Sequence, residues 1–82
     1  MTEILRVLVL YYACDIAAAE RHLTPPEWET CMGYYAEVKR HFADGETGPQ
    51  SHRLGYLEFK EWEDENPVLV TQLRERSQRF VR

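Results

Sequence analysis

Thr24-Pro25-Pro26-Glu27 is the stretch that decides the fold, because it marks the start of a helix almost to the residue. A threonine at the N-cap accepts a hydrogen bond from a backbone N–H that the first turn leaves free. Proline suits the first helical position, where its missing donor costs nothing. Glu27 stands three residues after Thr24 and completes a capping box. Asn66-Pro67 repeats the Asn-cap and proline pattern, so the sequence predicts a small helical domain.

The segment before this signal, residues 3–23, is predicted to be a helix. Its apolar residues recur at steps of three and four, and a second apolar row lies beside the first. The face left for water is narrow and holds Glu3, Arg6, Ala17 and Glu20. Such a helix should be buried on nearly all sides, at the centre of the domain or of a dimer. The alternative makes residues 4–12 a strand, because valine, leucine and tyrosine also suit a buried strand.

The helix that the signal opens should run from Pro25 to about Ala43 and end at Asp44-Gly45. Its inner seam is expected to consist of Trp28, Cys31, Tyr35, Val38 and Phe42.

Residues 45–52 are polar, contain two glycines and a proline, and are predicted to form a loop. Residues 53–65 fit a helix and a strand almost equally, and helix is preferred. A last helix starts at Asn66-Pro67. The predicted fold is all-α, a compact bundle of three to four helices forming one domain over residues 1–82. An α+β fold with residues 4–12 as a strand is the alternative.

The composition describes a small folded domain with apolar residues to spare. The chain has 82 residues, of which 44% are apolar and 12% aromatic, and this excludes a disordered protein. A domain of this length has a thin core. The excess of apolar residues therefore favours a partner or a homo-oligomer.

Two cysteines, Cys14 and Cys31, match no metal-binding spacing. Because small secreted domains usually carry more cysteines, both are expected to be reduced and buried in a cytoplasmic protein. A disulfide between two aligned helices is the alternative. The uncharged run from Val7 to Cys14 ends at Asp15, far short of a membrane span, so neither a signal peptide nor a membrane segment is expected.

No catalytic motif stands out, and we expect neither an enzyme nor a cofactor. The chain lacks a glycine-rich phosphate loop, a nucleophile elbow and the H-E-x-x-H motif. Cys31 could act as a nucleophile with His41 or His22 as base, but its place on a helix seam favours a packing role.

A metal-dependent enzyme or ligand-binding bundle is a weak alternative, based on Glu37 and His41 one turn apart, with His22 and His52 elsewhere. The repeated Glu-x-x-His motif of di-metal bundles is missing. Such a pair more often stabilises its own helix.

Arginines in the last helix raise the alternative of nucleic-acid binding; they are Arg74, Arg76, Arg79 and Arg82. The whole chain carries a net charge of −4, which argues against nucleic acid as a partner. Residues 58–65 hold five carboxylates and one lysine, so we expect the arginines to pair with this segment, within one chain or between subunits. Residues 27–65 could also imitate nucleic-acid phosphate, although an ordinary solvated face explains their charge better.

The aromatic residues are the best indication of function. They are too numerous for all of them to point inward, and exposed aromatic side chains beside charges are typical of protein interfaces. The predicted contact consists of Met32, Tyr34, Tyr35, Tyr56, Phe59 and Trp62. Its predicted acidic rim consists of Glu58, Glu61, Glu63, Asp64 and Glu65. We therefore expect a non-enzymatic, homodimeric protein-interaction module, such as an adaptor or an inhibitor of phage or bacterial origin.

Overall fold

A computed structural model describes residues 2–43 and 48–80 of the chain. Four α-helices follow one another: α1 (Thr2–Glu20), α2 (Pro25–Ala43), α3 (Ser51–Glu65) and α4 (Pro67–Ser77), and a short 3₁₀ turn, η1 (Gln78–Phe80), extends the last. The all-α prediction is confirmed. The alternative of a strand over residues 4–12 is wrong, because all of them lie within α1, and no strand occurs in the part of the chain just given.

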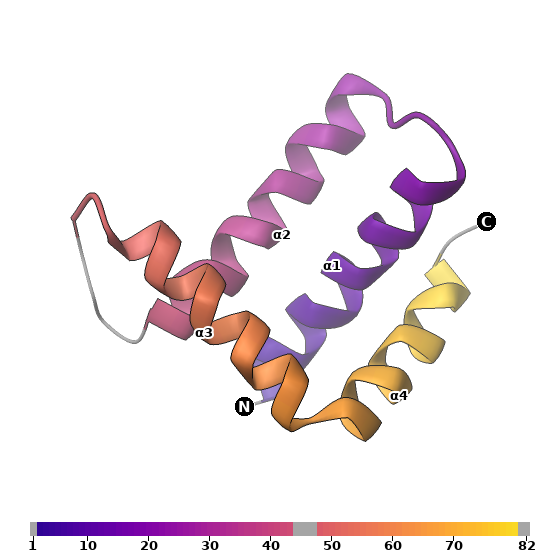
Figure 1. Cartoon of the computed structure of the whole chain (residues 1–82). Coiled ribbons are helices and arrows are strands. Elements are labelled where there is room, and N and C mark those ends of the chain that lie inside the picture. The colour runs from indigo at the N-terminus through magenta and orange to yellow at the C-terminus, as the bar shows by residue number, and fades with distance from the viewer. Residues whose placement is uncertain (1, 44–47, 81–82) are drawn as a thin grey trace.

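Helix α1 is the centre of the bundle, with α2 on one side and α4 on the other (Figure 1). It supplies most of the core, including Leu8 and Tyr12, which are fully buried. Ala17, predicted to face water, is only 8% exposed. The helix ends at Glu20 and not at residue 23, since the chain must turn over residues 21–24 to place Thr24 at the next N-cap.

Helix α2 begins and ends at the predicted residues, and its capping box is formed. The backbone N–H of Thr24 donates to Glu27 Oε1 at 2.9 Å, and the N–H of Glu27 donates to Thr24 Oγ1 at 3.4 Å. Arg21 donates to Glu27 Oε2 at 2.7 Å. This guanidinium, followed by the Thr24 donors, lowers the pKa of Glu27 to about 2. The predicted stop at Asp44-Gly45 lies outside the described residues.

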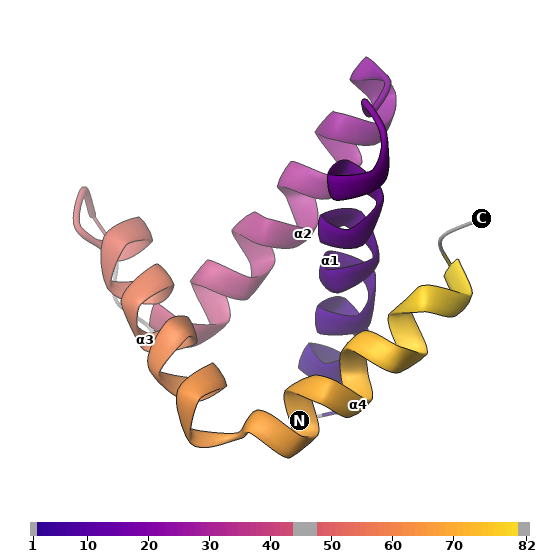
Figure 2. The same ribbon diagram turned by 45° about the vertical axis from the view of Figure 1, so that its right-hand side comes forward.

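Helix α3 starts two residues before the prediction, at Ser51, and crosses α2 closely (Figure 2). Gly55 permits this crossing. A Cβ built on Gly55 would overlap the carbonyl oxygen of Lys39 and lie 2.8 Å from its carbonyl carbon.

The junction between α3 and α4 differs in one detail from the predicted N-cap. Pro67 opens α4 as expected, but the Asn66 side chain forms no hydrogen bond to the start of that helix. Its amide instead donates to the carbonyl of Trp62 at 2.9 Å. Asn66 therefore closes α3, whose last carbonyls would otherwise lack a partner.

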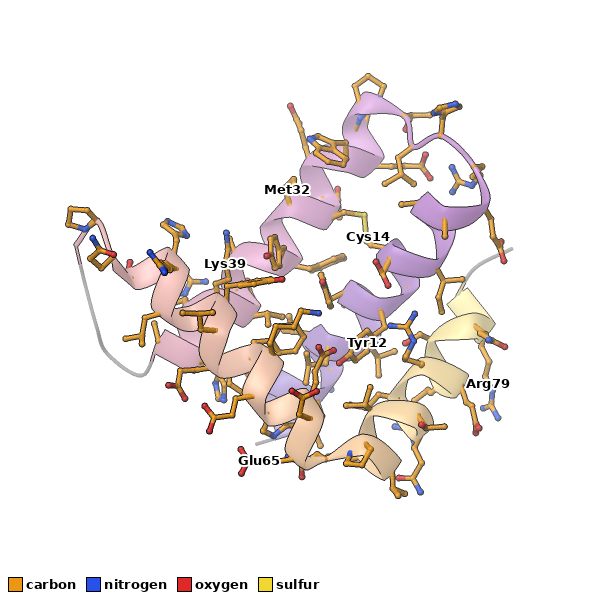
Figure 3. All side chains as sticks on the ribbon, in the orientation of Figure 1. Tyr12, Cys14, Met32, Lys39, Glu65 and Arg79 are labelled. Carbon is orange, nitrogen blue, oxygen red and sulfur yellow. A yellow bond between two sulfur atoms is a disulfide. The ribbon has the colours of Figure 1, made fainter. Side chains whose placement is uncertain are left out.

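The cysteines correct a second expectation. Cys14 of α1 and Cys31 of α2 form a disulfide, with their Cα atoms 5.8 Å apart. The prediction of two reduced, buried thiols is therefore wrong, and both residues are half-buried. The bond joins the two antiparallel helices six residues before the end of α1 and six residues after the start of α2, beside the Cys14 label in Figure 3.

Candidate protein-binding surface

Three of the large exposed apolar side chains belong to α2 and α3, the two helices with the closest crossing in the bundle. Trp28 is 56% exposed, Met32 41% and Tyr56 40%. Trp28, Met32 and Tyr35 follow one another at steps of four and three, so they share one side of α2. We call Trp28, Met32, Tyr35 and Tyr56 the contact strip.

Trp28 was predicted to lie on the inner seam of its helix, and this prediction is wrong. The seam is buried at Val38, but at the first turn of α2 the neighbouring residues are Ala18 and the loop residues His22 and Leu23. These neighbours are too few and too small to cover an indole ring. Trp28 is therefore a member of the surface that the sequence analysis missed.

Tyr35 anchors the strip to the core. Its ring stacks on that of Tyr11, with 5.5 Å between the centroids, and the Lys39 ammonium lies 4.3 Å from its centroid on α2. Partial burial, and next the nearby hydroxyl of Tyr56, raise the pKa of Tyr35. Gly55, the residue before Tyr56, lies against the backbone of Lys39, one turn after Tyr35, so the α2 and α3 parts of the strip adjoin each other.

Lysines border the strip where carboxylates were predicted. Lys60 Nζ lies 5.8 Å from the Tyr56 centroid, and Lys39 covers Tyr35. Cations held over aromatic rings in this way gain a modest cation–π attraction. The strip therefore has a lysine ammonium group over each of its two tyrosines, and Lys60 is also paired with Glu63 at 3.0 Å.

The predicted acidic rim does not surround these aromatic residues. Glu58, Glu61 and Glu65 are exposed and recur at steps of three and four, so they form a row of their own along another side of α3. Asp64 is exposed near the end of the helix. Glu63 turns inward, because its side chain is only 17% exposed and it accepts hydrogen bonds from Tyr12 and Lys60.

The remaining aromatic residues of the predicted contact are also divided. Phe59 is 1% exposed and belongs to the core, so it is not available to a partner. Trp62 is half-buried, with its ring centroid 5.5 Å from that of Phe42. Tyr34 lines an open groove of about 370 Å³ between α1 and α2, together with Leu10 and both cysteines. Of the predicted set, Met32, Tyr35 and Tyr56 are the members that belong to the contact strip.

The arginines of the last helix do not pair with the acidic segment as expected. Arg74 Nη2 lies 3.3 Å from Asp15 of α1, and its guanidinium lies over the Tyr12 ring at 5.1 Å. Arg76 and Arg79 are exposed, and Arg82 lies outside the described residues. Figure 3 shows Arg79 far from Glu65, near the other end of α4. No ion pair among the described residues joins α4 to residues 58–65.

The weak metal-binding alternative gains no support. Glu37 and His41 are exposed on α2, where Glu37 lies 4.0 Å from Arg40 and the His41 ring packs edge-on against Phe42. Within residues 2–43 and 48–80, no three side chains of the metal-binding types gather in one place.

No family model, curated protein or solved structure matches this chain. Among the helices of the described residues, none combines the length and the apolar character needed to cross a bilayer. Evidence for a function therefore has to come from the chemistry of the surface.

Proposed function

We propose that this chain is a non-enzymatic protein-interaction module that binds its partner through the contact strip. The exposure of Trp28 and Met32, one turn apart on α2, is the observation that carries the proposal. Tryptophan, tyrosine and methionine are the residues enriched at protein interfaces, and clusters of them mark the energetic centre of an interface.

The surroundings of the strip support binding by a rigid surface. The disulfide between Cys14 and Cys31 ties α2 to α1 within one helical turn of both Trp28 and Tyr35. Tyr35 is held by Tyr11 and Lys39. A surface whose side chains are already in place loses less conformational entropy on binding, so more of the contact energy appears as affinity.

The charges around the strip suggest the chemistry of the partner. The ammonium groups of Lys39 and Lys60 each lie over one of its two tyrosine rings. A complementary surface would offer apolar groups flanked by carboxylates, and such charge matching governs the rate and the specificity of association.

We also propose that the chain works where disulfides persist. The expectation of a cytoplasmic location rested on reduced cysteines, and the paired geometry of Cys14 and Cys31 removes that ground. Trapping free thiols with an alkylating agent in intact cells, followed by mass measurement, tests this point. Alkylation of both cysteines in unstressed cells would overturn this proposal and place the chain in a reducing compartment.

Site-specific photo-crosslinking tests the proposed function. The photoreactive amino acid p-benzoylphenylalanine replaces Met32 in one variant, and in the matched control it replaces Leu57, which is 50% exposed on another side of α3. The proposal expects one discrete protein adduct from position 32, its loss when Trp28→Ser is added, and no such adduct from position 57. Identical adduct patterns from both positions, or none from position 32, would overturn it.

A further inference from the structure

The outward side of α2 carries a charge pattern that is complementary to the same side of a second, antiparallel α2 helix. This outer face consists of Glu29, Met32, Gly33, Ala36, Lys39 and Arg40, which recur at helical spacing. Its acidic residue stands near the N-terminal end and its basic residues near the C-terminal end. The middle is small and apolar. Two such faces in antiparallel orientation would bring each carboxylate to the other's cations.

The middle of the outer face is open enough for another helix to approach. A Cβ built on Gly33 would meet nothing within 4 Å, and Ala36 is exposed. Small residues at a crossing let two helix backbones come close together. Met32, exposed beside them, supplies an adaptable apolar side chain.

A groove lies at the C-terminal end of the same face. It has a volume of about 340 Å³ and is lined by Ala36, Lys39, Arg40 and Ala43 of α2, with Gly48, Ser51 and His52 opposite. The four α2 residues are spaced like the hole that receives a knob in helix packing. Trp28 precedes Arg40 by twelve residues, about 18 Å along the helix at 1.5 Å per residue. It is the exposed side chain at the other end of the face that could fill such a hole.

We propose that the occupant of the outer face is a second copy of this chain, packed with its α2 antiparallel about a two-fold axis near residue 34. In this register each Glu29 faces Lys39 and Arg40 of the second copy, each Met32 packs beside Ala36 of the other, and each Trp28 enters the opposite groove. The inference rests on the proposed function and names the partner of the contact strip.

Self-complementarity favours a second copy over a different protein. A two-fold interface uses the same surface twice, so every attractive pair in it occurs twice. The outer face is self-complementary in two respects. Its opposite charges stand at nearly equal distances from residue 34, and it carries an exposed tryptophan at one end and a groove at the other. An unrelated partner would require neither.

Charge reversal tests the register. Glu29→Arg places three cations at each end of the paired faces, and Arg40→Glu places two anions there beside the single cation of Lys39. Each variant alone should therefore lose dimer affinity by roughly tenfold or more. Mixing the two variants restores an acid opposite a base at both ends, so the mixture should form a heterodimer. The matched controls, Glu61→Arg and Arg53→Glu, change the net charge equally at exposed sites on α3.

Sedimentation equilibrium and native mass spectrometry supply the readouts. The inference expects wild type and both control variants to have twice the chain mass. Each single variant should be a monomer, and their mixture should form a dimer. The circular dichroism spectrum should be the same for all of these proteins. A wild type that stays monomeric, or single variants that associate like the controls, would overturn it. If a monomeric wild type still gives an adduct with a different protein from position 32, only the second copy is refuted and the proposed function stands.

Discussion

The hydroxyl of Tyr12 donates a 2.6 Å hydrogen bond to Glu63, linking the centre of α1 to the last turn of α3. Tyr12 is fully buried, and Lys60 holds the other oxygen of the same carboxylate at 3.0 Å. Burial, and next the bond to Glu63, raise the pKa of Tyr12 well above its ordinary value. Large side chains of this kind connect two helices whose backbones lie well apart (Figure 2).

Tyr12→Phe should therefore lower the free energy of unfolding by about 1.5 kcal/mol, the lower range for a hydrogen bond to a charged group. The ring would still fill the core, and Glu63 would keep Lys60. Urea unfolding followed by circular dichroism measures the loss. Tyr56→Phe, at an exposed site, is the matched control and should leave stability within about 0.5 kcal/mol of wild type. Equal stability of both variants would show that this bond contributes nothing.

Local signals were sufficient to predict α2 but not the crossing of α2 and α3. Thr24 and Glu27 act within one turn, so their hydrogen bonds follow from the sequence alone. Gly55 instead counted against a helix over residues 53–65, because glycine weakens helices. Its role became visible only with Lys39 of another helix against it. The need for glycine at position 55 therefore comes from a contact between residues that are distant in the sequence.

Gly55→Ala should destabilise the fold by about 1–3 kcal/mol, the usual cost of overpacking, because the new methyl would overlap the Lys39 backbone. Gly33→Ala is the matched control in α2, where a Cβ meets open space. At protein concentrations low enough to keep the chain monomeric, that variant should be more stable than wild type by up to about 1 kcal/mol, since alanine is the better helix former. Thermal unfolding compares the three proteins. A destabilisation no larger at position 55 than at position 33 would contradict the close crossing.

The disulfide is the alternative and not the preferred prediction of the sequence analysis, although the sequence holds a signal for it. Cys14 and Cys31 lie at equal distances from the middle of the turn over residues 21–24, so an antiparallel pair of helices brings them opposite each other. Small secreted domains usually carry more than two cysteines, and this general rule favours reduced thiols in a chain with only two. The equal spacing of the two cysteines from the turn over residues 21–24 is the stronger evidence, because it concerns the geometry of this particular helix pair.

Removal of the disulfide should lower stability by about 3 kcal/mol, as expected for a closed loop of roughly this length. The comparison uses wild type with and without reductant, and a Cys14→Ala plus Cys31→Ala variant, which reductant should not affect further. Urea midpoints give the difference, and mass spectrometry after alkylation verifies the redox state. An oxidised wild type no more stable than the double variant would show that the bond does not constrain the chain.

The contact strip shows where periodicity stops being informative. A spacing of three and four residues placed Trp28 in the same row as Val38, and the row is real. Whether a position on that row is covered depends on the helix opposite. Val38 lies against the core, whereas Trp28 faces Ala18 and the loop. The sequence cannot supply the angle at which two helices cross, and that angle determines which end of a seam is exposed.

The capping box predicts a specific response to acid. The pKa of Glu27 is lowered from 4.5 to about 2 in the folded chain, mainly by Arg21 and then by the Thr24 donors. A carboxyl whose pKa falls on folding stabilises the fold above its unfolded pKa, and that contribution is lost as the pH falls through the folded pKa. The contribution of Glu27 should therefore be complete above about pH 4.5 and disappear towards pH 2.

Urea midpoints of wild type and Glu27→Gln at successive pH values measure this effect. Wild type should be the more stable protein at neutral pH, and the gap should narrow between pH 4.5 and 2, because protonated Glu27 resembles glutamine. Salt should also reduce the gap, since the ion pair with Arg21 is exposed. Glu58→Gln, at an exposed carboxylate of α3 outside the box, should keep the wild-type acid profile. A gap between wild type and Glu27→Gln that is the same at pH 7 and pH 2 would show that the charge of Glu27 does not stabilise the start of α2.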